Sequence, residues 1–529
     1  MRDFQFPGRS TVHAAEGMAA TSHPLATLAA VDVLRAGGNA VDACIAASAV
    51  LGVVEPESTG IGGDVFMLYC PSGKGEIHGY NGSGRAPRAL TADWLLGQGQ
   101  ASIGAESVHA VTVPGTVEAW DTIGKAHGRK DLAELLRPAI RFAEEGYVVA
   151  PRVAFDMANN ETKLRADPDA KRIFMPDGRT LAVGERHRQP EYAAALREIA
   201  MRGAAGFYTG WVAEDIVAKL KGLGGRHALE DFAAHEGEWV KPISTDYRGY
   251  DCFQIPPSGQ GVVALVMLNI LEGYEVKRLD PLGVERLHVQ GEAAKLGYAL
   301  RDGLVADTRH AKVPTGEMLD KAYAAKLRAR IAMDRVMPPP APDLFPAHSD
   351  TVYLTAVDRD RNVCSFINST FSNFGTGLVS PKSGIALQNR GSGFVVKPGH
   401  PNCVAPMKRP MHTIIPGMVQ KAGRVAFSYG VMGAHYQPFG HVWVLNNMID
   451  YGMDPQEAVD LPRCFLYQGD YGLERGIPEA TAQGLAALGH NVSRTPTPWG
   501  GSQIIAIDWQ RGTLTAGSDP RKDGCALGY

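Results

Sequence analysis

Residues 350–358 read DTVYLTAVD and follow a proline-dense stretch, VMPPPAPDLFP, at 336–346. The prolines disfavour a helix or a central strand, so this stretch is predicted to be an exposed connector. The residues after it are rich in β-branched and aromatic side chains and predict a strand over 351–358. Thr351 therefore opens a strand directly behind the clearest boundary in the chain.

A threonine at the start of a strand can act as a nucleophile if a base lies beside its hydroxyl. Its own α-amine, with a reference pKa of ~7.7–8.0, is such a base, but Thr351 gains a free amine only if its bond to Asp350 is cut. The connector would let the new end move away, and the strand would hold the hydroxyl on a rigid element. Most threonines that open strands are structural, so this pattern alone leaves both interpretations open.

Upstream of the connector, the pattern is mainly helical to about residue 330. Pro24 opens a helix that Gly37-Gly38 ends, and Asn39 is placed to cap a second helix that runs through Val53. Two apolar helices in succession are expected to cover a sheet. The strands expected in that sheet are 64–70 and 75–80. Further helices are expected over 132–136, 139–145, 262–271 and 284–301.

Pro138 is expected to separate the helices over 132–136 and 139–145. Strand patterns return only after the connector, at 351–358, 362–367, 424–429 and 503–508. A helix-rich first part and a strand-rich last third predict an α+β protein in which helices cover sheets in one interlocked body.

Composition excludes several classes of function. The 529 residues are 45% apolar and 21% charged, with 53 Lys and Arg against 56 Asp and Glu, so no basic surface for nucleic acid is expected. The most apolar stretch, residues 41–54, is shorter than a membrane span of about 20 residues. The N-terminus lacks the apolar core of a signal peptide, which predicts a cytoplasmic protein. The seven cysteines form no CxxC pair and are interpreted as reduced thiols.

Common cofactor and hydrolase motifs are missing as well. No HExxH occurs, and His435 and His441 are six residues apart, which does not place them on one helical face; no metal is expected. The chain also lacks GxxxxGK[ST], a GxGxxG after a strand, and GxSxG, which disfavours nucleotide binding and a serine-type amidase. We expect no organic cofactor.

The stretch around Thr351 resembles a known family. DTVYLTAVD at 350–358, followed by FGTG at 374–377 and SGIALQN at 383–389, is similar to the start of the small subunit of γ-glutamyltransferases (glutathione hydrolases). Further motifs of that family occur in the same order, so the resemblance spans nearly the whole chain. They are GGNAVDA at 37–43, GIGGD at 60–64, VPGTV at 113–117, PPSG at 256–259 and SDPR at 518–521.

The resemblance implies a precursor that cleaves itself between Asp350 and Thr351. The products would be a helix-rich large subunit, 1–350, with the connector at about 336–350, and a strand-rich small subunit, 351–529, that begins with the nucleophile. The two subunits would remain together as a heterodimer, which could pair further, in the four-layer αββα sandwich of N-terminal-nucleophile hydrolases.

The family also implies roles for individual residues. Thr351 would attack an amide of a small molecule, such as a γ-glutamyl compound like glutathione, and form an acyl-enzyme that water or an amine resolves. Ser369 lies where the family has a threonine whose hydroxyl assists the nucleophile. Gly433 and Ala434 align with the two residues whose main-chain N–H groups stabilise the oxyanion, and because these donors are backbone groups, alanine is compatible with this role.

The pocket for the acyl group departs from the family pattern. Ser83 lies at the position of the arginine that binds the substrate carboxylate, and Arg85, two residues later on the same strand face, is the expected substitute. Gly393 replaces the aspartate that binds the substrate ammonium. The other expected substrate-binding residues are Asn389, the new cation Arg390, and His412 and Thr413 in place of paired serines, while Phe371 replaces an asparagine.

These substitutions favour an anionic acyl group without an α-amine, similar to the oxamate amidohydrolase and cephalosporin acylase branches of the family. A γ-glutamyl substrate remains the expectation from the family as a whole. The alternative from another functional class is a binding protein that keeps the fold and never matures.

Overall fold

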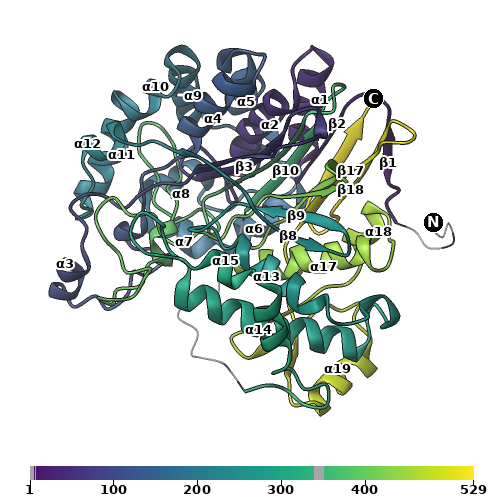
Figure 1. The fold of residues 1–529 in the computed structure, drawn as a ribbon. Coiled ribbons are helices and arrows are strands. Elements are labelled where there is room, and N and C mark those ends of the chain that lie inside the picture. Colours follow the sequence, from purple (N-terminus) through teal and green to yellow (C-terminus); the bar gives the residue numbers. More distant parts are fainter. Residues whose placement is uncertain (1–4, 6–7, 339–350) are drawn as a thin grey trace.

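The computed structural model describes residue 5 and residues 8–338 and 351–529 (Figure 1). Its centre consists of two seven-stranded sheets, and every pair of neighbouring strands in them is antiparallel. The order in the first sheet is β1 (Val12–Ala14), β18 (Thr513–Ser518), β17 (Ser502–Asp508), β13 (Arg424–Val431), β12 (Gly417–Lys421), β9 (Tyr250–Gln254) and β8 (Ile243–Tyr247). The order in the second is β19 (Cys525–Gly528), β2 (Met18–Thr21), β10 (Val352–Val357), β11 (Val363–Ser369), β3 (Asp64–Cys70), β4 (His78–Gly82) and β7 (Glu238–Val240).

Successive side chains along a central strand point to opposite faces of the sheet, so one strand contributes to two hydrophobic cores. In β3, the side chains of Val65, Met67 and Tyr69 pack against helices, whereas Phe66 and Leu68 pack between the two sheets. A strand buried on both faces reads as a continuous apolar run, which is why residues 64–70 are recognisable in the sequence.

Helices cover the outer face of each sheet, as the upper and lower parts of Figure 1 show. The predicted four-layer αββα, α+β architecture is therefore confirmed. Over the second sheet lie α1 (Pro24–Arg35), α2 (Ala40–Val54), α4 (Thr116–His127), α5 (Leu132–Glu145), α9 (Pro190–Arg202) and α11 (Trp211–Gly222). Over the first sheet lie α13 (Gly261–Leu271), α14 (Val284–Leu304), α16 (Lys321–Arg328), α17 (Gln437–Ile449) and α18 (Pro455–Asp460).

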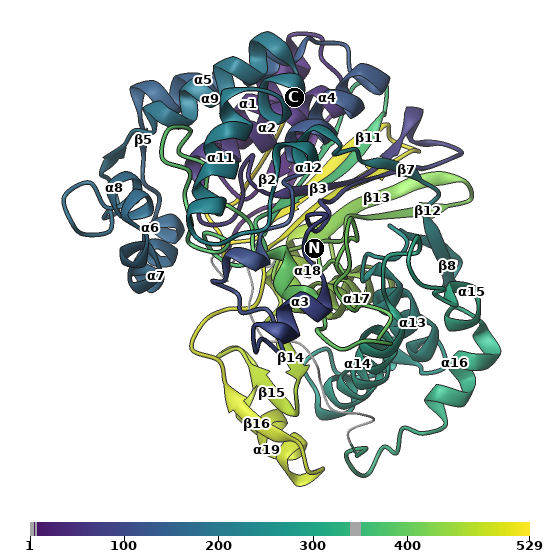
Figure 2. The same ribbon diagram turned by 90° about the vertical axis from the view of Figure 1, so that its left-hand side faces the viewer.

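Smaller elements surround this sandwich. Figure 2 shows a separate small sheet, with α19 beside it, at the end of the molecule away from α1 and α2. Its strands are β14 (Cys464–Tyr467), β15 (Asp470–Leu473) and β16 (Asn491–Arg494), and α19 spans Glu479–Ala487. The remaining elements are α3 (Ala92–Gly97), β5 (Tyr147–Val148), α6 (Pro151–Asn159), α7 (Glu161–Ala166), α8 (Pro168–Phe174), β6 (Arg186–His187), α10 (Ala205–Tyr208), α12 (Leu229–Ala233) and α15 (Thr315–Met318).

Segments on both sides of the undescribed residues 339–350 are interleaved. Each central sheet contains strands from before residue 338 and strands from after residue 351. In the second sheet, β10 and β11 lie between β2 and β3. Residues from both parts therefore pack together between the sheets, while the division into two subunits at residue 350 stays a prediction.

Several details differ from the expectation, and the central strands that no predicted range covers include β1, β2, β12, β18 and β19. Pro138 lies inside the continuous helix α5, because the helix buries Leu135 and Ala139 in the core, and this packing outweighs the loss of one backbone hydrogen bond. The strands β7–β9 were not predicted, since they lie at or beside the sheet edges and carry polar, partly exposed side chains. The expected strand over 75–80 is β4, which begins three residues later.

None of the helices in the described part of the chain combines the length and the apolar character needed to span a membrane.

The N-terminus of α2 provides a test of local stability. The Asn39 side chain accepts hydrogen bonds from the Val41 and Asp42 amides, and Asp42 accepts one from the Asn39 amide, so the capping box is complete. We predict that Asn39→Ala lowers the free energy of unfolding by about 1–2 kcal/mol, measured by chemical denaturation. Asp131→Ala is the matched control, since Asp131 caps α5 without a side-chain hydrogen bond; an equal loss in both variants would contradict the assignment.

Candidate active site

Thr351 is fully buried and leads directly into β10. The pairing of Val352 with Asn368 brings the start of β10 beside the end of β11, where Ser369 lies. The Thr351 Oγ1 and Ser369 Oγ atoms are 3.1 Å apart, and Gln437 Nε2 lies 3.4 Å from Thr351 Oγ1. Two sequence-predicted residues, Thr351 and Ser369, are thus brought together by strand register.

A buried arginine lies on the other side of Ser369. Arg390 donates from one terminal nitrogen to Thr413 Oγ1 at 2.6 Å and from the other to Ser369 Oγ at 3.3 Å. Its guanidinium also stacks on the ring of Phe371, 4.2 Å from the centroid. Burial lowers the pKa of Arg390 to about 9, an effect that the charge of Asp64 opposes. Arg390 Nε is buried and has no hydrogen-bond partner among the described residues.

The hydrogen-bonded pair of Asp64 and His412 interacts electrostatically with Arg390. The Asp64 carboxylate accepts a 3.0 Å hydrogen bond from His412 Nε2, and both side chains are fully buried. Burial and the charge of Arg390 lower the pKa of His412 to about 3, so His412 is neutral at pH 7. Burial alone would raise the pKa of Asp64, but the interactions with His412 and Arg390 lower it. Asp64 is therefore the ionised group nearby, and three further donors fix it: the amides of Gly84 and Gly115 and the side chain of Gln388.

The loop at Gly433 and Ala434 approaches the nucleophile from the first sheet. Gly433 has a φ of 112°, a conformation that suits glycine, and the loop leads into α17, which begins at Gln437. Neither the Gly433 nor the Ala434 amide has a backbone acceptor among the described residues. The Gln437 side chain contacts Thr351, so the N-terminal end of α17 borders the nucleophile, and the role of the Gly433 and Ala434 amides as oxyanion donors stays a prediction.

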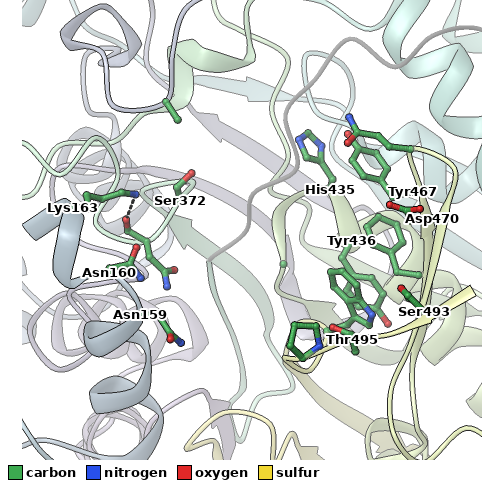
Figure 3. Close-up of a pocket in the computed structure, with 18 of the residues that line it drawn as sticks. Asn159, Asn160, Lys163, Ser372, His435, Tyr436, Tyr467, Asp470, Ser493 and Thr495 are labelled. Carbon is green, nitrogen blue, oxygen red and sulfur yellow. Dashed lines mark hydrogen bonds between the residues drawn. The ribbon is translucent and has the colours of Figure 1, made fainter.

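A cavity of about 820 Å³ opens beside Gly433 (Figure 3). One wall is polar and includes Asn159, Asn160, Lys163 and Ser372, while aromatic rings form the opposite wall. Those rings belong to Tyr436, Phe465, Tyr467 and Trp499. The cavity is large enough for a small organic molecule and reaches the loop that carries the expected oxyanion donors.

The remaining predicted residues lie elsewhere or have structural contacts. Arg85 donates to the Glu236 carbonyl, and the strongest charge interaction on it comes from Arg409. Asn389 orders the adjacent turn by accepting from the Ser372 amide and donating to Ser372 Oγ. Substrate binding by these two residues stays a prediction. Asp350 lies outside the described residues.

Sequence reasoning missed three residues that shape the site. Gln437 contacts the nucleophile, Asp64 carries the charge opposite Arg390, and Gln260 donates to the carbonyls of Thr413 and Ala434, which ties two parts of the site together. Asp64 belongs to the GIGGD motif, whose last residue is a visible signal for a functional carboxylate. Gln260 directly follows the PPSG motif, but no sequence feature singles out either glutamine.

One group in the described part of the chain has the composition of a metal site: His288, Glu292 and His490. It contains neither Thr351 nor Arg390, so it is separate from the constellation described above. His288 and Glu292 are four residues apart on α14, so both lie on one helical face. This HxxxE spacing differs from the HExxH motif.

Comparison with known proteins identifies the family of this chain. The family model for γ-glutamyltranspeptidase matches residues 26–529. The chain belongs to the γ-glutamyltranspeptidase family. Members of this family have the N-terminal-nucleophile hydrolase fold, and the chain is a hydrolase or acyltransferase of this type.

Its relatives include enzymes with different named activities. The glutathione hydrolase-like YwrD proenzyme of Bacillus subtilis (strain 168) is 38% identical over 97% of this chain and 98% of the relative. The acylase ACY 1 proenzyme of Pseudomonas sp. (strain V22) is 36% identical over 96% of this chain and 92% of the relative. The crystal structure of cephalosporin acylase from Bacillus halodurans superimposes with a TM-score of 0.93 at 40% identity, over 100% of this chain and 99% of that one. This family member is therefore similar to a divergent, acylase-containing branch.

Removal of the Ser369 hydroxyl tests the geometry beside the nucleophile. Ser369→Ala removes the contact with Thr351 Oγ1 and an acceptor for Arg390, so we predict that kcat falls about 10- to 100-fold on a chromogenic amide that wild type cleaves. Ser369→Thr keeps the hydroxyl and is expected to retain most of the activity. Equal kcat values for Ser369→Ala and wild type would show that the hydroxyl has no part in the reaction.

Proposed function

We propose that the chain is a precursor that cleaves itself between Asp350 and Thr351 and becomes active as a heterodimer of residues 1–350 and 351–529. The supporting observations are the buried Thr351 at the head of β10, its contact with Ser369, and relatives that are named proenzymes. Because both parts share the same two sheets, cleavage would leave the fold intact.

The proposed reaction uses the new N-terminus as its base. The free α-amine of Thr351 accepts the hydroxyl proton while Oγ1 bonds to the amide carbon of the substrate. The Gly433 and Ala434 amides stabilise the resulting oxyanion. The proton then passes to the departing nitrogen, the C–N bond breaks, and an acyl ester of Thr351 remains. Water, or an amine in a transfer reaction, attacks this ester and releases the acyl group.

The acyl group that fits this site best is a carboxylate-bearing chain without an α-ammonium. The observation behind this proposal is the buried Arg390, whose Nε is unpartnered among the described residues and whose terminal nitrogen lies 3.3 Å from Ser369 Oγ. A substrate carboxylate would supply the counter-charge that a buried cation requires. Gly393 offers no carboxylate for an ammonium group, and Asp64 is already occupied by four donors.

The amine portion of the substrate would occupy the cavity beside Gly433. Its aromatic wall suits a leaving group with a flat or apolar surface, and Lys163 on the opposite wall adds a cation. A γ-glutamyl compound is the second candidate, which the family match itself favours.

A comparison of three anilides tests the proposed acyl specificity. We expect glutaryl anilide to be cleaved with a higher kcat/KM than γ-glutamyl anilide, and Arg390→Met to lower kcat/KM for glutaryl anilide about 100-fold while changing butyryl anilide, which has no carboxylate, far less. Arg286→Met is the matched control, because Arg286 is a buried arginine that donates to the Pro281 carbonyl and to Asn447 and is not one of the predicted substrate-binding residues.

Two results would contradict this assignment. Faster cleavage of γ-glutamyl anilide than of glutaryl anilide would favour the second candidate. Equal losses on glutaryl and butyryl anilide in Arg390→Met would show that Arg390 supports the fold of the site and does not bind the acyl carboxylate.

A further inference from the structure

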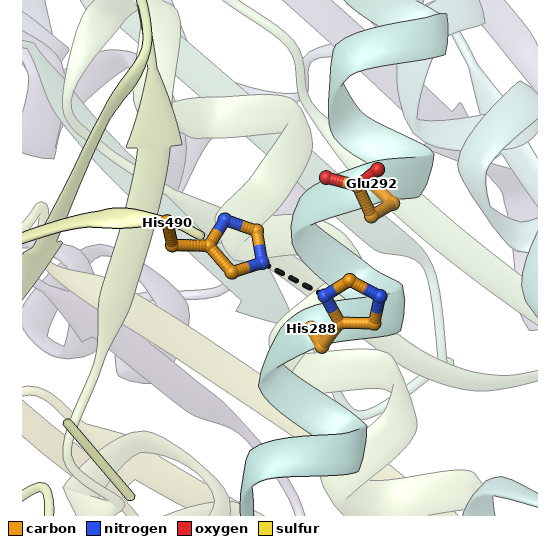
Figure 4. A group of neighbouring side chains, drawn as sticks. All are labelled: His288, Glu292 and His490. Atoms are coloured by element: carbon orange, nitrogen blue, oxygen red, sulfur yellow. Dashed lines mark hydrogen bonds between the residues drawn. The ribbon is translucent and has the colours of Figure 1, made fainter. Parts of the chain in front are cut away.

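A second cluster of side chains that could bind a metal ion lies where α14 meets the turn before β16 (Figure 4). His288 and Glu292 extend from the same face of the helix, and His490, from the turn before β16, points at them. All three are buried, and one ligand atom of each lies within 4.8 Å of the other two. His288 Nδ1 and His490 Nε2 are 2.8 Å apart.

The hydrogen bonds around the cluster leave these atoms suited to a cation. His288 Nε2 lies 2.8 Å from the Ala332 carbonyl, so this nitrogen carries the proton and Nδ1 has a lone pair directed toward His490. A metal-binding histidine is commonly oriented by such a bond from its other ring nitrogen. Glu292 is held in turn by the Met337 amide at 2.7 Å and by Lys295 Nζ at 2.7 Å.

The second ring nitrogen of His490 can hold the proton that metal binding would displace. His490 Nδ1 is buried and has no hydrogen-bond partner among the described residues. A cation between the two imidazoles would displace the proton they share, and that proton could move to His490 Nδ1 without a net change in charge.

A cavity of about 300 Å³ borders the cluster. Lys295, Met337 and His490 are among its lining residues, so the cavity gives an entry route and room for a water molecule. Two imidazoles, one carboxylate and one water form a donor set that suits Zn²⁺ in tetrahedral geometry.

We propose that His288 Nδ1, His490 Nε2 and a Glu292 carboxylate oxygen bind one Zn²⁺ ion, with water from the adjacent cavity as the fourth ligand. With Zn–N distances of about 2.0–2.1 Å, the two ring nitrogens would separate to roughly 3.3 Å, which a small rotation of either ring provides.

The position of this site indicates a structural role. His288 and Glu292 precede residues 339–350 and His490 follows them, so the ion would connect the two parts of the chain. The same side chains contact Ala332 and Met337, in the last described segment before those residues. If the proposed cleavage takes place, the ion would cross-link the two subunits and stabilise the large-subunit segment that contains Ala332 and Met337. The site itself does not depend on cleavage.

The test uses the full-length protein without a histidine tag, stripped with a chelator and dialysed. Titration with Zn²⁺ is followed by calorimetry, and Co²⁺ absorption reports tetrahedral coordination. We expect one ion per chain, a rise in Tm of about 2 °C or more on Zn²⁺ addition, and an affinity at least about 100-fold lower in His490→Gln. Glu292→Gln is the second variant if His490→Gln does not fold.

Two control variants test whether zinc binding depends on this cluster alone. His187→Gln removes a buried histidine bonded to Tyr147 and the Ile173 carbonyl and should leave zinc binding unchanged. Thr351→Ala should also bind zinc normally, so failure of the proposed cleavage can be distinguished from failure of the metal site. Equal zinc binding by wild type and a His288→Gln/His490→Gln double variant, or no binding by wild type, would overturn the proposal.

Discussion

The pairing of β10 with β11 is the constraint on which the proposed chemistry depends. It places Thr351 at the start of one strand and Ser369 at the end of its neighbour, with their hydroxyl oxygens 3.1 Å apart in the middle layers of the sandwich. A slip by one residue would turn the side chains of β10 to the opposite face. That slip is prevented because Tyr353 packs between the sheets while Val352 and Leu354 pack against helices, so the same alternation that builds both cores also fixes the nucleophile.

The charges of Arg390 and Asp64 bear on which acyl group the proposed site would bind. Arg390 is fully buried, and the nearby negative charge, Asp64, is shared with His412, Gln388 and two backbone amides. A buried cation that lacks a dedicated carboxylate is costly unless a ligand supplies one. In the proposed function, an acyl group with its own carboxylate would complete the site, whereas an added ammonium group would find no free carboxylate near Gly393 among the described residues.

Short sequence patterns were enough to predict much of the fold. Asn39, Gly37-Gly38 and the apolar run at 64–70 identified α1, α2 and β3 because caps and two-sided burial leave direct traces in sequence. The strands β7–β9 were missed and the break at Pro138 was wrong, since tertiary packing decides both. In the site, Thr351, Ser369 and Arg390 came from motif comparison, but Gln437 and Gln260 did not, because their contacts join segments more than 80 residues apart. The cluster on α14 was missed for the same reason, as His490 is distant in sequence.

The central claim is that Thr351 becomes an N-terminal nucleophile through cleavage of its own chain. An intact-mass time course of the purified full-length protein beside Thr351→Ala tests it most directly. Wild type is predicted to resolve into two fragments, one ending at Asp350 and one beginning at Thr351, while Thr351→Ala remains whole. If both proteins stay intact, the self-processing account is contradicted and a non-maturing binding protein becomes the better interpretation. If Thr351→Ala is cut at the same bond, the cleavage does not use the Thr351 hydroxyl, which also contradicts the account.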